Sequence, residues 1–82
     1  MKVGIISIGD ELINGYTIDT NSNFIASKLK EYKNLDVSNI CIVGDDLKVI
    51  SDNLDHLINN NFKYIFLTGG LGPTHDDLTK KV

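Results

Sequence analysis

The fold is decided by residues 64–77, which read Tyr64-Ile65-Phe66-Leu67-Thr68-Gly69-Gly70-Leu71-Gly72-Pro73-Thr74-His75-Asp76-Asp77. The first four residues are apolar and rich in β-formers, and they predict a strand buried on both faces, as parallel strands are. Thr74 can cap a helix that has Asp77 at its third position, as in a short capping box. The chain is therefore expected to pass from a buried strand through a glycine turn into a helix.

The glycine turn has the features of a phosphate site. Gly69, Gly70 and Gly72 permit positive φ and let a ligand approach the main chain closely. Backbone N–H groups at the start of a helix bind anions such as phosphate. Asp76 and Asp77 lie in the same turn, and phosphate avoids carboxylates unless a cation lies between them. We expect a phosphorylated ligand with a divalent metal, although a plain strand–helix connection also uses glycines and acidic residues.

Composition limits the partners of this chain. Its 82 residues make one small domain, with 8 basic and 11 acidic residues, a net charge of −3 and no arginine. Nucleic-acid binders normally carry a basic patch, so a nucleic-acid partner is not expected. Without arginine forks, a phosphate must be held by main-chain N–H groups, by lysine or through a metal.

The first strand and the single cysteine bear on localisation. Residues 3–8 form a short apolar run followed by Gly9-Asp10-Glu11, which is not a cleavage site, so we expect a strand and not a signal peptide. No run has membrane-spanning length, so no membrane partner is expected. Cys41 lies within an apolar run and is expected to be inert. One cysteine allows no internal disulfide, which favours a reducing cytoplasm.

Three strands alternate with two helices in the predicted order of elements, β-α-β-α-β. The strands are expected at residues 3–8, 37–43 and 62–67. One helix is expected from a cap at residues 19–21 to about residue 33, and a second from a cap at residue 45 or 46 to residues 59–61. Their predicted buried stripes are Phe24, Ile25, Leu29 and Tyr32, and Leu47, Ile50, Leu54, Leu57 and Ile58. His56 falls off its stripe and should face solvent.

This pattern predicts an α/β fold of three layers, α/β/α, with a parallel sheet in strand order 2-1-3. The crevice between the carboxyl ends of strands 1 and 3 is then the switch point where ligands bind. The loops at residues 9–18 and 69–77 meet there. Each loop carries an acidic pair, Asp10 with Glu11 and Asp76 with Asp77, and both pairs are expected to face the crevice.

The two loops together resemble those of CinA-type proteins, in the molybdopterin-binding domain superfamily. The matching residues include Ser7-Ile8-Gly9-Asp10-Glu11-Leu12, Asp19-Thr20-Asn21, Val43-Gly44-Asp45 and Thr68-Gly69-Gly70-Leu71-Gly72-Pro73-Thr74-His75-Asp76-Asp77-Leu78-Thr79. The resemblance is collinear over the whole chain. It departs from the family pattern at Asp10, where relatives often carry threonine.

The resemblance implies a three-layer domain and a metal-dependent pyrophosphatase acting on ADP-ribose or a similar compound. The implied ligand-binding residues are Gly9, Gly69, Gly70, Gly72 and Thr74. Asp76 and Asp77 would hold a divalent cation, either magnesium-like or a transition metal, or orient the attacking water. Glu11 would assist catalysis from the opposite loop, as a second metal contact or a general base.

Two other interpretations stay open. The chain could be a non-catalytic module that binds a molybdopterin-like ligand, or an inactive fragment. The family domain is about twice as long, so residues 1–82 are interpreted as its N-terminal half. The uncharged run at residues 64–67 would form an unprotected sheet edge, so we expect self-association or a separate C-terminal half as partner.

Overall fold

The computed structural model describes residues 1–69 of the 82-residue chain. The elements of this part are, in chain order, β1 (Lys2–Ile8), α1 (Asp10–Ile13), α2 (Thr20–Leu29), β2 (Asp36–Val43), α3 (Leu47–Asn59) and β3 (Phe62–Gly69). None of these helices is long and apolar enough to cross a membrane.

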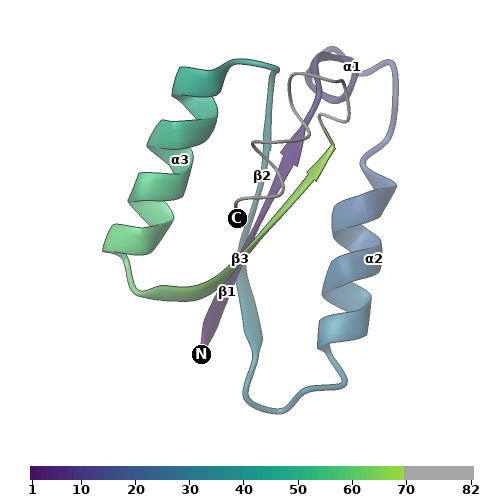
Figure 1. Ribbon diagram of the computed structural model, residues 1–82. Helices are drawn as coiled ribbons and strands as arrows, with labels where there is room; N and C mark the ends of the chain where they lie inside the picture. Colours follow the sequence, from purple (N-terminus) through teal and green to yellow (C-terminus); the bar gives the residue numbers. More distant parts are fainter. Residues whose placement is uncertain (70–82) are drawn as a thin grey trace.

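The described strands form one parallel sheet in the order β2-β1-β3, which confirms the predicted topology. Figure 1 shows α2 and α3 on opposite faces of this sheet, so the described part has three layers. β1 pairs along its whole length with both neighbours, from Lys2 to Ile8. The sheet is therefore built around β1, whose carboxyl end lies beside α1 (Figure 1).

The elements differ from the predicted ones in five places. β1 and β2 each begin one residue earlier than predicted, and β3 continues two residues further, to Gly69. The predicted loop at residues 9–18 contains the one-turn helix α1. α2 ends at Leu29 instead of about residue 33. The next residues continue in a tighter turn, where the amides of Glu31 and Tyr32 bond to carbonyls three positions earlier.

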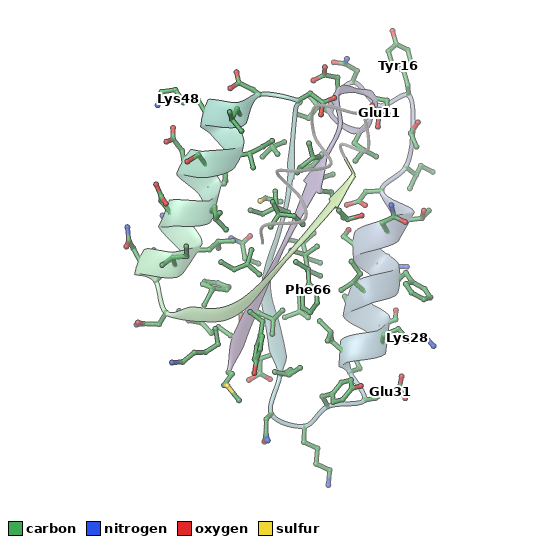
Figure 2. All side chains as sticks on the ribbon, in the orientation of Figure 1. Glu11, Tyr16, Lys28, Glu31, Lys48 and Phe66 are labelled. Atoms are coloured by element: carbon green, nitrogen blue, oxygen red, sulfur yellow. The ribbon has the colours of Figure 1, made fainter. Side chains whose placement is uncertain are left out.

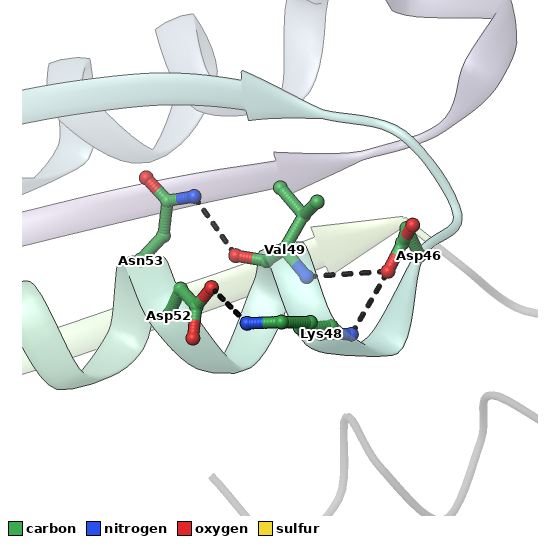
Figure 3. Close-up of polar contacts among 5 residues, drawn as sticks. All are labelled: Asp46, Lys48, Val49, Asp52 and Asn53. Carbon is green, nitrogen blue, oxygen red and sulfur yellow. Dashed lines mark hydrogen bonds and ion pairs between the residues drawn. The ribbon is translucent and has the colours of Figure 1, made fainter.

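α3 begins at a well-formed cap. The Asp46 carboxylate accepts hydrogen bonds from the amides of Lys48 and Val49, at 2.9 and 3.2 Å (Figure 3). Lys48 pairs with Asp52 one turn later, at 3.0 Å, and this exposed pair contributes little to stability because solvent screens it. The helix ends at Asn59, and Asn61 takes φ 67°, the left-handed conformation that asparagine tolerates.

The main apolar cluster lies between the sheet and α3. Ile6, Ile8 and Val43 of the sheet pack with Ile50 and Leu57 of α3, all at most 5% exposed. Cys41, Phe62, Ile65 and Leu67 line this cluster and are partly buried. The predicted stripe of α3 is correct at its centre but not at its ends, because Leu47 and Ile58 are exposed at its margins. His56 is exposed, as predicted.

The buried side of α2 differs from the predicted stripe. Ser22 and Leu29 are buried and Ile25 is partly buried, whereas Phe24 is 62% exposed and Tyr32 is also exposed. Successive residues of a helix are rotated by about 100°. Phe24 is two positions from Ser22 and therefore faces the opposite side. The predicted stripe was correct at Ile25 and Leu29 and wrong at Phe24 and Tyr32, because the small Ser22 lies on the side that contacts the sheet and Tyr32 lies beyond the end of α2.

β3 is an edge strand within residues 1–69, and it is not buried on both faces as predicted. Ile65 and Leu67 face the α3 cluster, but Tyr64 and Phe66 are 48% and 37% exposed on the other face. Figure 2 shows Phe66 on the α2 side of β3. On the same face, Ile40 of β2 is also half-exposed. α2 alone is too narrow to cover three strands.

Candidate functional site

A cavity of about 130 Å³ opens at the carboxyl ends of β1 and β3. Its walls come from the two strand ends, α1, the following loop and the start of α2. The lining residues are Ser7, Ile8, Glu11, Leu12, Thr17, Ile18, Asp19, Thr20, Asn21, Thr68 and Gly69. We call this cavity the crevice. It lies at the switch point of the sheet, where the strand order predicts a ligand site.

Two of the predicted site residues, Glu11 and Gly69, meet at the crevice. They lie 58 positions apart in the sequence and come from opposite loops. Figure 2 shows Glu11 on α1, at the end of the sheet where the strands finish. Gly70, Gly72, Thr74, Asp76 and Asp77 lie outside the described residues, so their predicted roles remain predictions.

Gly9 lies beneath the Glu11 side chain. Its φ of 161° is extended, so its conformation does not require glycine. A Cβ at this position would meet the Glu11 carboxylate, including Oε1 in very close contact and the carboxyl carbon at 2.9 Å. Glycine therefore makes room for the carboxylate to fold back over the main chain. Any larger residue would displace Glu11 from this position.

Gly69 is required by the backbone itself. Its φ is +93°, which side chains rarely adopt. A Cβ would also collide with the carbonyl oxygen of Ile8, its partner in the sheet register. The positive φ that the glycines were predicted to permit is confirmed at Gly69, and the close approach of two strands is a further reason for glycine there. This close approach brings the ends of β1 and β3 together at the crevice.

Asp10 differs from Glu11, the other member of its predicted acidic pair. It does not line the crevice, because Oδ1 turns toward the loop after β2 and accepts a hydrogen bond from the Asp45 amide at 3.1 Å. Neighbouring residues on a helix point about 100° apart, so Asp10 and Glu11 face different sides of α1. The expectation that both acids face the crevice was wrong for this reason.

Asp19 provides a second carboxylate in the crevice. It caps α2, accepting bonds from Ser22 N–H at 3.1 Å and from Ser22 Oγ at 2.5 Å. Partial burial alone would raise the pKa of the Asp19 carboxyl. The bonds from Ser22 and the nearby hydroxyl of Ser7 favour the charged form and outweigh burial, so the pKa lies below its ordinary value. Asp19 is therefore a carboxylate at neutral pH.

Ser7 is the buried polar residue of the crevice. It is fully buried, and its Oγ makes no hydrogen bond of standard geometry within residues 1–69, although it lies close enough to Asp19 to influence the pKa of that carboxyl. Buried hydroxyls without a partner are rare in folded proteins. The Ser7 hydroxyl is therefore available to a water or to a polar group of a ligand that enters the crevice.

The described residues do not form a metal centre by themselves. No group of three or more carboxylate, histidine or cysteine side chains among residues 1–69 could hold a metal ion. Glu11 and Asp19 supply two carboxylates of the kind that Mg²⁺ prefers, but the set is incomplete. The predicted metal ligands, Asp76 and Asp77, lie outside the described part.

Five polar residues of the crevice were not among the predicted site residues: Ser7, Thr17, Asp19, Thr20 and Asn21. The sequence contains a notable feature at two parts of the crevice wall. Ser7 is the only polar residue between Val3 and Ile8, and Asp19-Thr20-Asn21 were recognised as caps without asking what a helix start would face. A polar residue inside a buried strand is unusual, whereas a polar helix start is an ordinary cap, so only Ser7 gave a specific signal.

A larger groove, about 400 Å³, lies between α2 and β2, distant from the residues of the crevice. It is lined by Ala26, Leu29, Lys30, Leu35, Asp36, Val37 and Ile40. Most of these side chains are apolar, and the two charged residues are exposed. The groove lacks the convergent polar groups that fix the orientation of a ligand. The smaller crevice is therefore the better candidate site.

Comparison with known proteins identifies relatives of this chain. Residues 4–82 match the family described as "Probable molybdopterin binding domain". A protein of Pyrococcus abyssi is 48% identical over 79 residues, which are 96% of this chain and 31% of the relative. A CinA-like protein of Flavobacterium psychrophilum is 43% identical over 81 residues, 99% of this chain and 19% of the relative.

Two solved structures share the fold. The CinA protein of unknown function from Thermoplasma acidophilum has a TM-score of 0.83 and 31% identity, covering 99% of this chain and 48% of that one. The molybdopterin biosynthesis enzyme MoaB of Thermus thermophilus has the same TM-score at 23% identity, covering 98% and 52%, and supports the fold alone. The chain thus spans about a fifth to a half of the length of these relatives.

Proposed function

This chain belongs to the molybdopterin-binding domain family, and we propose that it is the ligand-binding half of a CinA-like, metal-dependent pyrophosphatase acting on ADP-ribose or a similar compound. One observation carries the proposal. The crevice at the carboxyl ends of β1 and β3 brings Glu11 and Gly69 together beside the polar start of α2.

The proposed binding mode follows from the charges of the crevice. Its described walls contain two acidic residues and no lysine, so a phosphate would not be held there by direct ion pairs. Main-chain N–H groups of Gly69, Gly70 and Gly72 would hold it instead. Asp19 and the hydroxyl of Ser7 would accept or share hydrogen bonds with the uncharged part of the ligand, such as sugar hydroxyls.

The proposed reaction is hydrolysis of the pyrophosphate. A water oxygen forms a bond to phosphorus, the bridging P–O bond breaks, and the products are AMP and ribose 5-phosphate. Glu11 accepts the proton of the water as general base. Asp76 and Asp77 are proposed to hold a divalent ion, which would polarise the phosphoryl oxygens when bound.

A second candidate is a module that binds a molybdopterin-like ligand without turning it over. The description of the family favours it.

The proposed partner in either case is a second copy or a C-terminal half that covers β3, since the described edge presents Tyr64 and Phe66. Burial raises the pKa of the Cys41 thiol, so this cysteine is mostly protonated. The proposed compartment is the cytoplasm, on the basis of the single cysteine.

The test is incubation of the protein with ADP-ribose and Mg²⁺ or Mn²⁺, with AMP release as the readout. Glu11→Gln should lower kcat by about 10²–10⁴-fold, as expected for loss of a general base. Asp76→Asn combined with Asp77→Asn should abolish the metal dependence while keeping the helix cap. Asp52→Asn, on the exposed side of α3, is the matched control and should have no effect.

The outcomes separate the candidates. Metal-dependent turnover lost in the variants supports the pyrophosphatase. Binding without turnover favours the binding module. Unchanged metal dependence in the double variant would show that Asp76 and Asp77 serve only as part of a helix start.

A further inference from the structure

The Asp10 side chain joins two loops that are far apart in the sequence. Its Oδ1 accepts the Asp45 N–H at 3.1 Å, a contact across 35 positions. Beside it, the Gly9 amide donates to the Val43 carbonyl at 2.9 Å. The loop after β1 and the loop after β2 are therefore connected twice, once through main chain and once through this carboxylate.

Gly44 leaves room for this connection because it has no side chain. A Cβ at residue 44 would lie 2.6 Å from Asp10 Oδ1 and 3.7 Å from the Ile13 Cδ1 methyl. The first contact is far shorter than van der Waals distance, so a methyl group here would displace the carboxylate. The second shows that Ile13 also reaches this loop. α1 thus rests on residues 44 and 45 through both of these side chains.

The connection fixes the orientation of α1. A helix of four residues is too short to be stable alone, so its position depends on what holds it. Asp10 and Ile13, three positions apart, lie on the side of α1 that faces the β2–α3 loop. Glu11 is rotated by about 100° from Asp10 and lines the crevice instead.

We propose that Asp10 is a positioning residue, which holds α1 against the β2–α3 loop and thereby keeps the Glu11 carboxylate over the crevice. The effect on ligand binding rests on the proposed function, whereas the connection between the loops does not. The same contact lets the β2–α3 loop influence the crevice, since displacement of residues 44 and 45 would move α1.

The proposal is tested by a double-mutant cycle between residues 10 and 44. Asp10→Ala removes the acceptor, and Gly44→Ala displaces it. Each should weaken ADP-ribose binding by roughly tenfold, because α1, which forms one wall of the crevice, loses the hydrogen bond to a charged group that holds it in place. The double variant should be no weaker than either single variant, since both changes break the same contact. Asp10→Asn keeps an acceptor oxygen and should bind like the unchanged protein.

A second readout works without a ligand. Amide hydrogen exchange at Asp45 should accelerate in Asp10→Ala, as should exchange at Asn14 and Tyr16, whose amides bond to carbonyls of α1. Asp52→Asn is the control and should leave all three unchanged. If the unchanged protein does not bind ADP-ribose, the proposed function fails, and exchange still decides whether Asp10 positions α1.

Two results would overturn the proposal. Unchanged exchange at Asp45 in Asp10→Ala would show that the loops are not held by this carboxylate. Faster exchange at Asp45 alone, with Asn14, Tyr16 and ADP-ribose affinity unchanged, would show that the contact exists but does not position α1.

Discussion

The two faces of the sheet are built differently. On the α3 face, Ile6 and Ile8 pack against Ile50 and Leu57 in a continuous apolar cluster. On the α2 face, β1 is equally buried, but the neighbouring strands present Ile40 and other large side chains to solvent. The polar groups of the crevice, such as Ser7, also belong to the α2 face.

The two faces therefore differ in what they contribute to folding stability and to ligand chemistry in this small chain. The α3 face supplies most of the described apolar burial and needs nothing from the ligand. The α2 face has less packing, and it contains a buried hydroxyl and an ionised cap that contribute little to the core. Changes on the α3 face should therefore affect mainly folding, and changes to the polar residues of the α2 face, such as Ser7, mainly binding.

The largest expected effect is on the α3 face. Leu57→Ala should lower the free energy of unfolding by about 2–5 kcal/mol, because Leu57 is 1% exposed and its removal leaves a cavity. Ile40→Ala is the matched change on the α2 face. It should cost under about 1.5 kcal/mol, since Ile40 is already 47% exposed. Urea unfolding measures both, and equal losses would contradict the division between the faces.

Gly69→Ala should have the next largest effect. This residue is the end of β3, where the sheet borders the crevice. The positive φ and the collision with the Ile8 carbonyl should cost about 1–3 kcal/mol or more. Thermal melts would measure this loss. Gly15→Ala is the control, because Gly15 also has positive φ but no atom within 4 Å of an added Cβ. If both variants lose the same stability, the strand contact at Gly69 is unimportant.

Asp19→Ala should cost about 0.5–2 kcal/mol at pH 7 through loss of the helix cap. Because the folded pKa of Asp19 is lowered, its stabilising effect is complete above the ordinary value and is lost as pH falls through the folded pKa. The difference between the two proteins should therefore shrink below about pH 4. Urea unfolding at several pH values checks this sign, and a difference that grows in acid would contradict it. Asp19→Asn should keep the cap without the pH dependence.

Ser7→Ala should have the smallest effect on folding. The hydroxyl makes no standard hydrogen bond within residues 1–69, so its removal should change stability by less than about 1 kcal/mol. Affinity for ADP-ribose should nevertheless fall by roughly five- to tenfold, the value of one hydrogen bond. Calorimetry measures the affinity. Unchanged affinity with lower stability would mean that Ser7 belongs to the core and not to the site.

The strand order could be predicted from the sequence because it depends on coarse features. Three apolar runs at residues 3–8, 37–43 and 62–67, separated by helix-length segments, leave few topologies once crossovers must be right-handed. The strand order also predicts that Glu11 and Gly69 lie at one crevice, as they do. Caps were also predictable, since Asp46 was one of two proposed residues and is the one used.

The side of each helix that faces the sheet or the crevice was less predictable than the strand order. The α2 stripe was wrong at Phe24 because several apolar positions competed, and contact with the sheet selected the side with Ser22 and Leu29. Asp10 was expected at the crevice because the loop after the first strand reaches the switch point, but the sequence did not indicate that α1 would form and separate Asp10 from Glu11. Such details depend on contacts between loops that are distant in the sequence.

The proposed function requires that the ligand binds in the crevice between the ends of β1 and β3. An NMR titration with ADP-ribose tests this directly. With Mg²⁺ present, amide shifts should change at Ser7, Asp19 and Gly69 and stay constant at Ala26 and Val37 in the apolar groove. Shifts confined to the groove, or absent at saturating ADP-ribose, would contradict the account.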